Sequence, residues 1–213
     1  MHDRTRRWAE LVGGFVLFPL MVGWWVPPMA WIPSLWVAAL MAWWMLRQAD
    51  RNGSFPEAPK QESEIVVLRL VLARFAICAV ALAAFVRIWL PGHFLNFPRE
   101  RPLIWMAVCG LYPLLSVYPQ ELIYRRFFFR RLAGLWASSV RLSVASAIAF
   151  SWMHLILRNP VAVGLTLVGG WFFAETYRRS RSLRLVCLEH ALYGTLVFTV
   201  GLGHYIYHGA VRP

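Results

Sequence analysis

Six ionisable residues lie inside long apolar stretches of this 213-residue sequence, where burial of charge in lipid is costly. They are Arg74, Glu121, His154, Glu175, Glu189 and His190. Three short stretches carry most of them: QELIYR (120–125), FSWMH (150–154) and LEHALYG (188–194). A carboxylate and two imidazoles that face one cavity can activate a water molecule and stabilise an oxyanion. Glu121, His154 and His190 therefore form the minimum set of groups for hydrolysis.

Each of these residues also has a purely structural explanation. Glu121 and Arg125 are four residues apart, which is the spacing of an ion pair on one helix face. A lone histidine in a membrane span, such as His154 or His190, is also explained by a structural role, as a hydrogen-bonding group between helices. Glu189 precedes His190 directly, so their side chains diverge by about 100° around a helix and cannot both face one point.

The elements that must position these groups are long apolar runs. Hydrophobic residues make up 59% of the chain and charged residues only 15%, which is too apolar for an ordinary soluble domain. The runs that reach, or nearly reach, the length needed to cross a hydrocarbon core of about 30 Å are at about 11–26, 29–46, 66–90, 103–123, 142–157, 161–177 and 185–203. We predict an all-α, polytopic transmembrane helix bundle of about seven spans.

The net charge of +12 does not indicate a nucleic-acid partner, because the arginines lie at the ends of the apolar runs and form no basic stripe with interleaved aromatics. A cytoplasmic N-terminus places most arginine clusters inside, as the positive-inside rule prefers. The basic start resembles a secretory signal but continues directly into another apolar span, so it is interpreted as a retained anchor. The predicted location is the inner (cytoplasmic) membrane, with the lipid bilayer as the surroundings of the protein.

Two segments divide the chain. PPMAWIP (27–33) predicts a tight helix hairpin, because prolines cannot continue a helix. The only long polar segment, 47–64, is typical of a cytoplasmic loop. Residues 1–64 are thus predicted to form an N-terminal transmembrane hairpin and loop, and residues 65–213 the main membrane bundle. In the bundle, GLTLVGG (164–170) contains small residues that allow close helix approach.

The predicted depths of the candidate groups agree only in part. Glu121 lies four residues before an arginine cluster and His190 six after Arg184, so both lie roughly 6 to 9 Å from the cytoplasmic side. His154 lies thirteen residues after Arg141, which places it roughly 20 Å deep. The helix that carries His154 must therefore start deeper, tilt or kink.

Together the three stretches resemble the CPBP (CAAX protease and bacteriocin-processing, also called ABI) intramembrane proteases, which include the CAAX prenyl endopeptidases. The resemblance covers about residues 100–205. The family pattern is Glu-Glu-x-x-x-Arg, then Phe-x-x-x-His, then His-x-x-x-Asn or a similar residue, on successive helices. Arg125, His154 and His190 stand in the matching places. The resemblance implies that His154 is a partner of the attacking water and that His190 is an oxyanion donor.

Two positions depart from the family pattern. Gln120 stands where the family has its first Glu, and Gly194 stands where it often has Asn. A neutral amide can position a water but cannot take its proton, so activity requires another base. Glu121 is the obvious candidate, provided that a helix irregularity such as one near Pro119 turns it toward the site. Glu189 is a second candidate.

Three functions remain open at this point. The leading hypothesis is a glutamate-type intramembrane endopeptidase, a hydrolase that cleaves a membrane-associated peptide or protein near the cytoplasmic face. Gln120 and Gly194 motivate a second hypothesis, a catalytically silent relative that acts as a membrane scaffold or chaperone. The third is a transporter or lipid-modifying enzyme, although the sequence has no two similar halves typical of a transporter.

The sequence requires no cofactor. The family carries the label of metalloendopeptidase, and two histidines plus one carboxylate on separate helices could hold zinc with an open position. In that case the ligands would be His154, His190 and Glu121.

Overall fold

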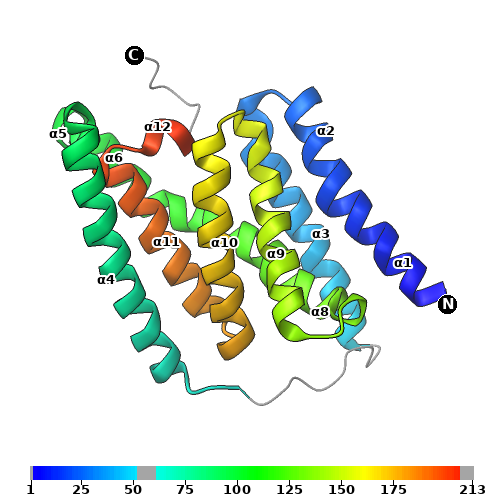
Figure 1. The fold of residues 1–213 in the computed structure, drawn as a ribbon. Helices are drawn as coiled ribbons and strands as arrows, with labels where there is room; N and C mark the ends of the chain where they lie inside the picture. Colours follow the sequence, from blue (N-terminus) through cyan, green and yellow to red (C-terminus); the bar gives the residue numbers. More distant parts are fainter. Residues whose placement is uncertain (1, 52–60, 207–213) are drawn as a thin grey trace.

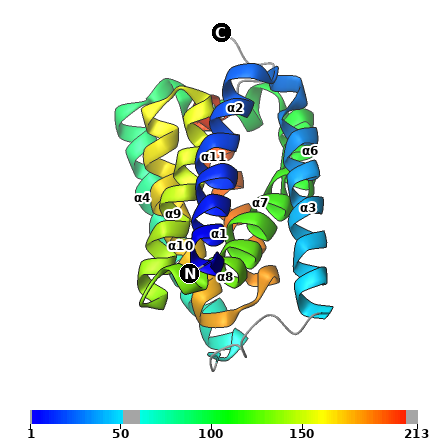
Figure 2. The same cartoon turned by 90° about the vertical axis from the view of Figure 1, so that its right-hand side faces the viewer.

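The computed structural model describes residues 2–51 and 61–206, and every regular element within these ranges is helical (Figures 1 and 2). The prediction of an all-α bundle is therefore confirmed for the described residues. Residues 52–60 of the predicted polar loop lie outside them.

Six helical segments of the described residues are long and apolar enough to cross a membrane: Arg4–Trp25, Pro28–Arg51, Glu64–Trp89, Pro102–Arg131, Ser139–Leu157 and Leu183–Val200. The protein is thus a multi-pass membrane protein. The remaining predicted span corresponds to α10 (Pro160–Ser180), a 21-residue helix that is not among the six. The prediction of about seven spans is confirmed for six of them.

The N-terminal hairpin is built from two antiparallel helices. In the first, α1 (His2–Leu11) and α2 (Phe18–Trp25) are joined by a π-helical segment, Val12–Leu17. This helix ends before Pro27 and Pro28, because two prolines in succession cannot supply the backbone donors of a further turn. After one 3₁₀ turn, α3 (Trp31–Arg51) returns across the bundle (Figure 2). This turn is the hairpin predicted from PPMAWIP.

The helix that carries Gln120 and Glu121 is irregular. It follows α4 (Glu64–Trp89) and the short α5 (Asn96–Glu100). Its pieces, in chain order, are α6 (Pro102–Tyr112), a π-helical segment (Pro113–Val117), α7 (Tyr118–Glu121), a second π-helical segment (Leu122–Phe127) and α8 (Phe128–Arg131). Pro113 and Pro119 each remove a backbone donor, which disfavours a regular α-helical ladder here.

The last three long helices have clear N-terminal caps. They are α9 (Ser139–Met153), which continues into a 3₁₀ turn (His154–Leu157), then α10, then α11 (Leu183–Val200), before the short α12 (Gly203–Ile206). Ser138, Asn159 and Ser182 each accept a hydrogen bond from a backbone N–H of the helix that they precede. α10 packs along α9 and α11, and α4 packs against α11 (Figure 1).

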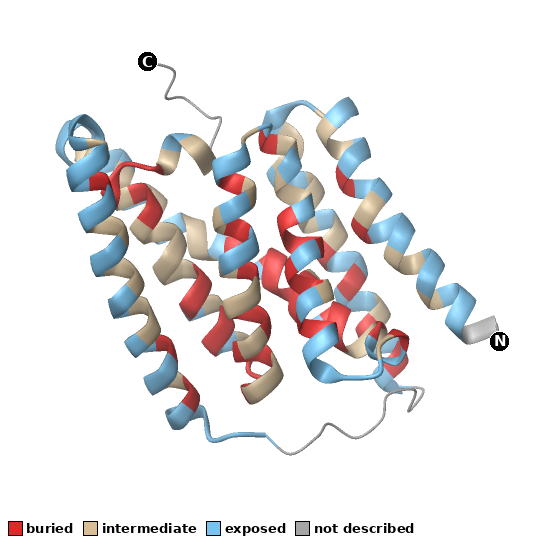
Figure 3. Cartoon of the chain, in the orientation of Figure 1, coloured by how far each residue is buried: buried red, intermediate tan, exposed pale blue. Residues whose placement is uncertain are grey.

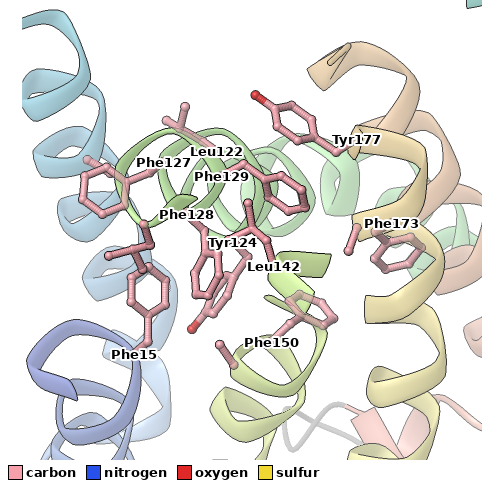
Figure 4. Packing of buried hydrophobic residues seen from close by; sticks show 14 of the residues in the cluster. Phe15, Leu122, Tyr124, Phe127, Phe128, Phe129, Leu142, Phe150, Phe173 and Tyr177 are labelled. Atoms are coloured by element: carbon pink, nitrogen blue, oxygen red, sulfur yellow. The ribbon is translucent and has the colours of Figure 1, made fainter. Parts of the chain in front are cut away.

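The core lies in the middle of the bundle, and the outer helices are exposed over most of their length (Figure 3). It is rich in aromatic rings from α8, α9, α10 and the segments next to them (Figure 4). The ring of Phe15, for example, meets that of Phe128 edge to face at 4.9 Å between centroids. The outer faces carry large apolar side chains such as Trp25 (79% exposed) and Val80 (71% exposed), which suits contact with lipid tails.

Candidate functional site

Glu121 and His190 are in direct contact, although 69 residues separate them in the chain. Nδ1 of His190 donates to Oε1 of Glu121 at 2.7 Å. Glu121 is the last residue of α7, with a π-helical segment on either side. The irregularity that the sequence required near Pro119 is therefore present, and it accompanies an inward-facing Glu121.

Arg125 holds the other oxygen of this carboxylate. Its Nε lies 3.1 Å from Oε2 of Glu121, and both side chains are fully buried. The Arg125 guanidinium also donates to Oγ of Ser146 at 2.6 Å and to the carbonyl of Tyr124 at 3.2 Å. A buried charge needs such partners to be tolerated. Glu121 is consequently clamped between a guanidinium and an imidazole, an arrangement that orients the His190 ring.

The second nitrogen of His190 is bonded to a tyrosine. The Tyr112 hydroxyl lies 2.9 Å from Nε2 of His190, across 78 residues of sequence. The ring of His190 also stacks on Phe173 at 4.6 Å and meets the edge of Phe150 at 5.5 Å. Sequence reasoning missed Tyr112, because one tyrosine in an apolar run carries no signal that distinguishes it from a packing residue.

His154 has one fixed and one available ring nitrogen. It follows the last residue of α9, and its Nδ1 donates to the Phe150 carbonyl at 2.8 Å. Its Nε2 makes no hydrogen bond among the described residues, so it carries an available lone pair. The Phe150 ring lies between the two histidines, with its centroid 4.8 Å from that of His154.

Both histidines line one cavity of about 380 Å³. Tyr112 and Gly194 line it as well, and its remaining walls are mostly apolar side chains of α4, α10 and α11, including Leu82, Phe85, Leu165, Phe172 and Leu196. His154 and His190 therefore reach a common space despite the depths predicted from the sequence. A cavity of this kind can hold an apolar group beside a small polar reaction centre.

Gln120 and Glu189 do not line this cavity. Nε2 of Gln120 donates to Oγ of Ser116 at 2.7 Å on the same helix. Glu189 forms an ion pair with Arg74 of α4, which also donates to Oγ1 of Thr176 at 3.0 Å. Arg74 and Glu189 thus join α4, α10 and α11 within the membrane region, and the sequence indicated no partner for either.

The proposed zinc ligands do not form a metal site in this arrangement. Within residues 2–51 and 61–206, no group of three or more His, Cys, Asp or Glu side chains is placed to hold a metal ion. The two nitrogens of His190 are already bonded to Glu121 and Tyr112. A zinc ion on His154, His190 and Glu121 would have to displace these bonds, so this geometry fits acid–base chemistry by the side chains better.

Comparison with known proteins identifies the region that carries the site. Residues 101–196 match the family model described as type II CAAX prenyl endopeptidase Rce1-like. Comparison with curated proteins and with solved structures gave no match. The matched residues include Tyr112, Glu121, His154, His190 and Gly194. The chain therefore carries a domain of the Rce1-like type II CAAX prenyl endopeptidase (CPBP) family, a family of membrane proteases.

Proposed function

We propose that the protein is an intramembrane endopeptidase that hydrolyses a peptide bond in a membrane-associated peptide or protein. One observation carries this proposal: two histidines with different hydrogen bonding line the same cavity. His154 has an available Nε2, whereas the His190 ring is held by Glu121. Membership of a membrane-protease family supports the same reaction class.

In this proposal His154 is the general base. Its Nε2 takes a proton from a water molecule while the water oxygen attacks the peptide carbonyl carbon. The carbonyl oxygen becomes an oxyanion on the His190 side of the cavity. When the intermediate collapses, the carbon–nitrogen bond breaks and His154 returns its proton to the leaving nitrogen. Glu121 does not face the substrate in this scheme, and it keeps His190 oriented.

We further propose seven spans with a cytoplasmic N-terminus in the inner membrane. α10 lies between α9 and α11, runs antiparallel to both and has 21 residues (Figure 1). At about 1.5 Å per residue it is about 31 Å long, which matches a hydrocarbon core of about 30 Å. Arg184 at the start of α11 is then cytoplasmic, and His190 lies about 9 Å further along the helix. Cleavage would occur nearer to the cytoplasmic face.

A comparison of membrane-protein termini by mass spectrometry tests the activity. Four strains are needed: wild type, a deletion, His154→Ala and His93→Ala, with the variants expressed at equal levels. His93 stacks on His204 at 5.0 Å, away from the cavity, and is the matched control. We expect a terminus that is present in wild type and His93→Ala and absent from the other two. Such a terminus also identifies the substrate.

Gln120 supports one competing function, the catalytically silent scaffold or chaperone. Its amide cannot take a proton, and it is bonded within its own helix. The same four strains decide between the two functions. If His154→Ala matches wild type at every terminus while the deletion still has a phenotype, the endopeptidase proposal is wrong and the scaffold function is supported.

A further inference from the structure

Tyr112 fills the space that a side chain at position 194 would need. A Cβ added at Gly194 would lie 2.6 Å from Cζ of Tyr112 and closer still to its hydroxyl oxygen. Gly194 lies within the regular helix α11, so its backbone does not require glycine. The Tyr112 ring can therefore occupy its position only because residue 194 has no side chain.

The hydroxyl of Tyr112 is placed where it can act on a substrate. It lies 2.9 Å from Nε2 of His190, and the tyrosine lines the cavity that His154 also lines. Tyr112 comes from α6, whereas His190 and Gly194 come from α11. The hydroxyl therefore lies next to His190 but comes from α6, whereas a side chain at position 194 would come from α11.

We propose that Tyr112 is a catalytic residue that donates a hydrogen bond to the oxyanion, in place of the side chain that Gly194 lacks. This assignment rests on the proposed endopeptidase function. When Nδ1 alone of His190 is protonated, Nε2 accepts from the Tyr112 hydroxyl. The developing oxyanion is a stronger acceptor than this neutral imidazole, so the hydroxyl hydrogen bond turns from Nε2 to the substrate oxygen.

The oxyanion step balances with these groups. The water oxygen forms a bond to the carbonyl carbon, and the carbonyl π electrons move to its oxygen, which accepts the Tyr112 hydrogen bond. His154 holds the proton from the water. When the electrons return, the carbon–nitrogen bond breaks and that proton moves to the nitrogen. The products are a carboxylic acid and an amine, and Tyr112 keeps its own proton throughout.

Tyr112→Phe removes the hydroxyl and keeps the ring beside Gly194. We expect kcat to fall by about 10²–10³-fold with little change in KM, which is the usual effect of losing one oxyanion donor. The matched control is Tyr118→Phe, because Tyr118 belongs to the same irregular helix but packs against Trp36 and does not line the cavity. Its kcat should stay near that of wild type.

The assay uses the purified full chain in proteoliposomes. The probe is an internally quenched peptide that ends in a farnesylated cysteine followed by three residues, as the family name suggests. The melting temperature of each variant is measured in parallel. An intact fold with reduced kcat separates a catalytic role from a structural one.

An exchange of the two positions tests the assignment independently. Gly194→Asn should be impaired because its side chain overlaps the Tyr112 ring, and Tyr112→Ala because it lacks the donor. The double variant Tyr112→Ala/Gly194→Asn should regain at least about tenfold over either single variant, since it restores one donor beside His190. A double variant no more active than the worse single variant contradicts the assignment.

The outcomes separate the two proposals. Activity of Tyr112→Phe within about threefold of wild type, together with an inactive His154→Ala, overturns the assignment of Tyr112 alone, since a lost donor costs far more. If the wild type leaves the probe intact, the endopeptidase proposal and the assignment both fail. If His154→Ala cleaves the probe equally well, cleavage does not use this cavity, and the roles of His154 and Tyr112 fail together.

Discussion

At the scale of single residues, the site depends on a carboxylate that is enclosed by protein. Glu121 lies between Arg125 and His190, and Arg125 has no exposed surface. Loss of one partner of a buried pair leaves the other charge uncompensated, which costs far more than loss of a surface ion pair. The stability of the bundle and the orientation of His190 are therefore linked through one carboxylate.

We expect Arg125→Met to lower the free energy of unfolding by about 3–5 kcal/mol. Arg178→Met is the matched control, because Arg178 forms its ion pair with Glu175 at a partly exposed position and its loss should cost at most about 1 kcal/mol. Denaturant unfolding of the purified protein in detergent measures both. Equal losses of unfolding free energy in the two variants would show that the buried ion pair stabilises the fold no more than the partly exposed one.

At the scale of elements, the contact between α9 and α10 determines where Phe150 lies. A Cβ at Gly170 would lie 3.0 Å from Cδ1 of Phe150 and 3.2 Å from the carbonyl oxygen of Ala147. Phe150 in turn contacts both histidines. Close approach of these helices is therefore a condition for the arrangement of the site.

Gly170→Ala should accordingly separate α9 from α10, lowering both the melting temperature and the turnover of the probe. Gly164→Ala lies on the same helix, where an added Cβ meets nothing within 4 Å. That substitution should be neutral or stabilise by up to about 1 kcal/mol through helix propensity. Thermal unfolding and probe turnover of the two variants check this pair, and similar losses in both would contradict the role of the interface.

These glycines also show which features of the structure can be predicted from the sequence and which cannot. Small residues in 164–170 predicted a close helix contact, and Gly170 makes one, but the spacing could not show that Gly164 faces open space. The ion pair of Glu121 with Arg125 follows from a spacing of four residues. The contact of Tyr112 with His190 depends on the rotation of two helices across π-helical turns, which no local pattern specifies.

At the scale of the whole molecule, charged residues tie several helices together at the end where α1 begins. Arg131 of α8 forms an ion pair with Glu10 of α1 at 2.6 Å, and Arg130 forms one with Asp50 of α3 at 2.6 Å. An end rich in arginine is the end that the positive-inside rule assigns to the cytoplasm. The two turns that flank α10 should then lie on opposite sides of the membrane.

Single-cysteine labelling tests this orientation. In a background in which Cys78, Cys109 and Cys187 are replaced, Arg158→Cys should react with an impermeant maleimide in spheroplasts. Arg184→Cys should react only after the membrane is opened, although the Arg184 side chain is 88% exposed in the protein. Equal labelling of both before opening would place the two turns on one side and contradict a membrane-spanning α10.

Because of the π-helical segment Pro113–Val117, the geometry of the site depends on how many residues lie between Tyr112 and Glu121. Eight residues separate Tyr112 from Glu121, and they include this wider turn. Loss of one residue there would restore a regular helix and rotate Tyr112 by about 100° relative to Glu121. Loops absorb insertions and deletions, but this segment cannot. Chain length between these two residues is therefore as constrained as their chemistry, and evolution would have to change the length and the side chains together.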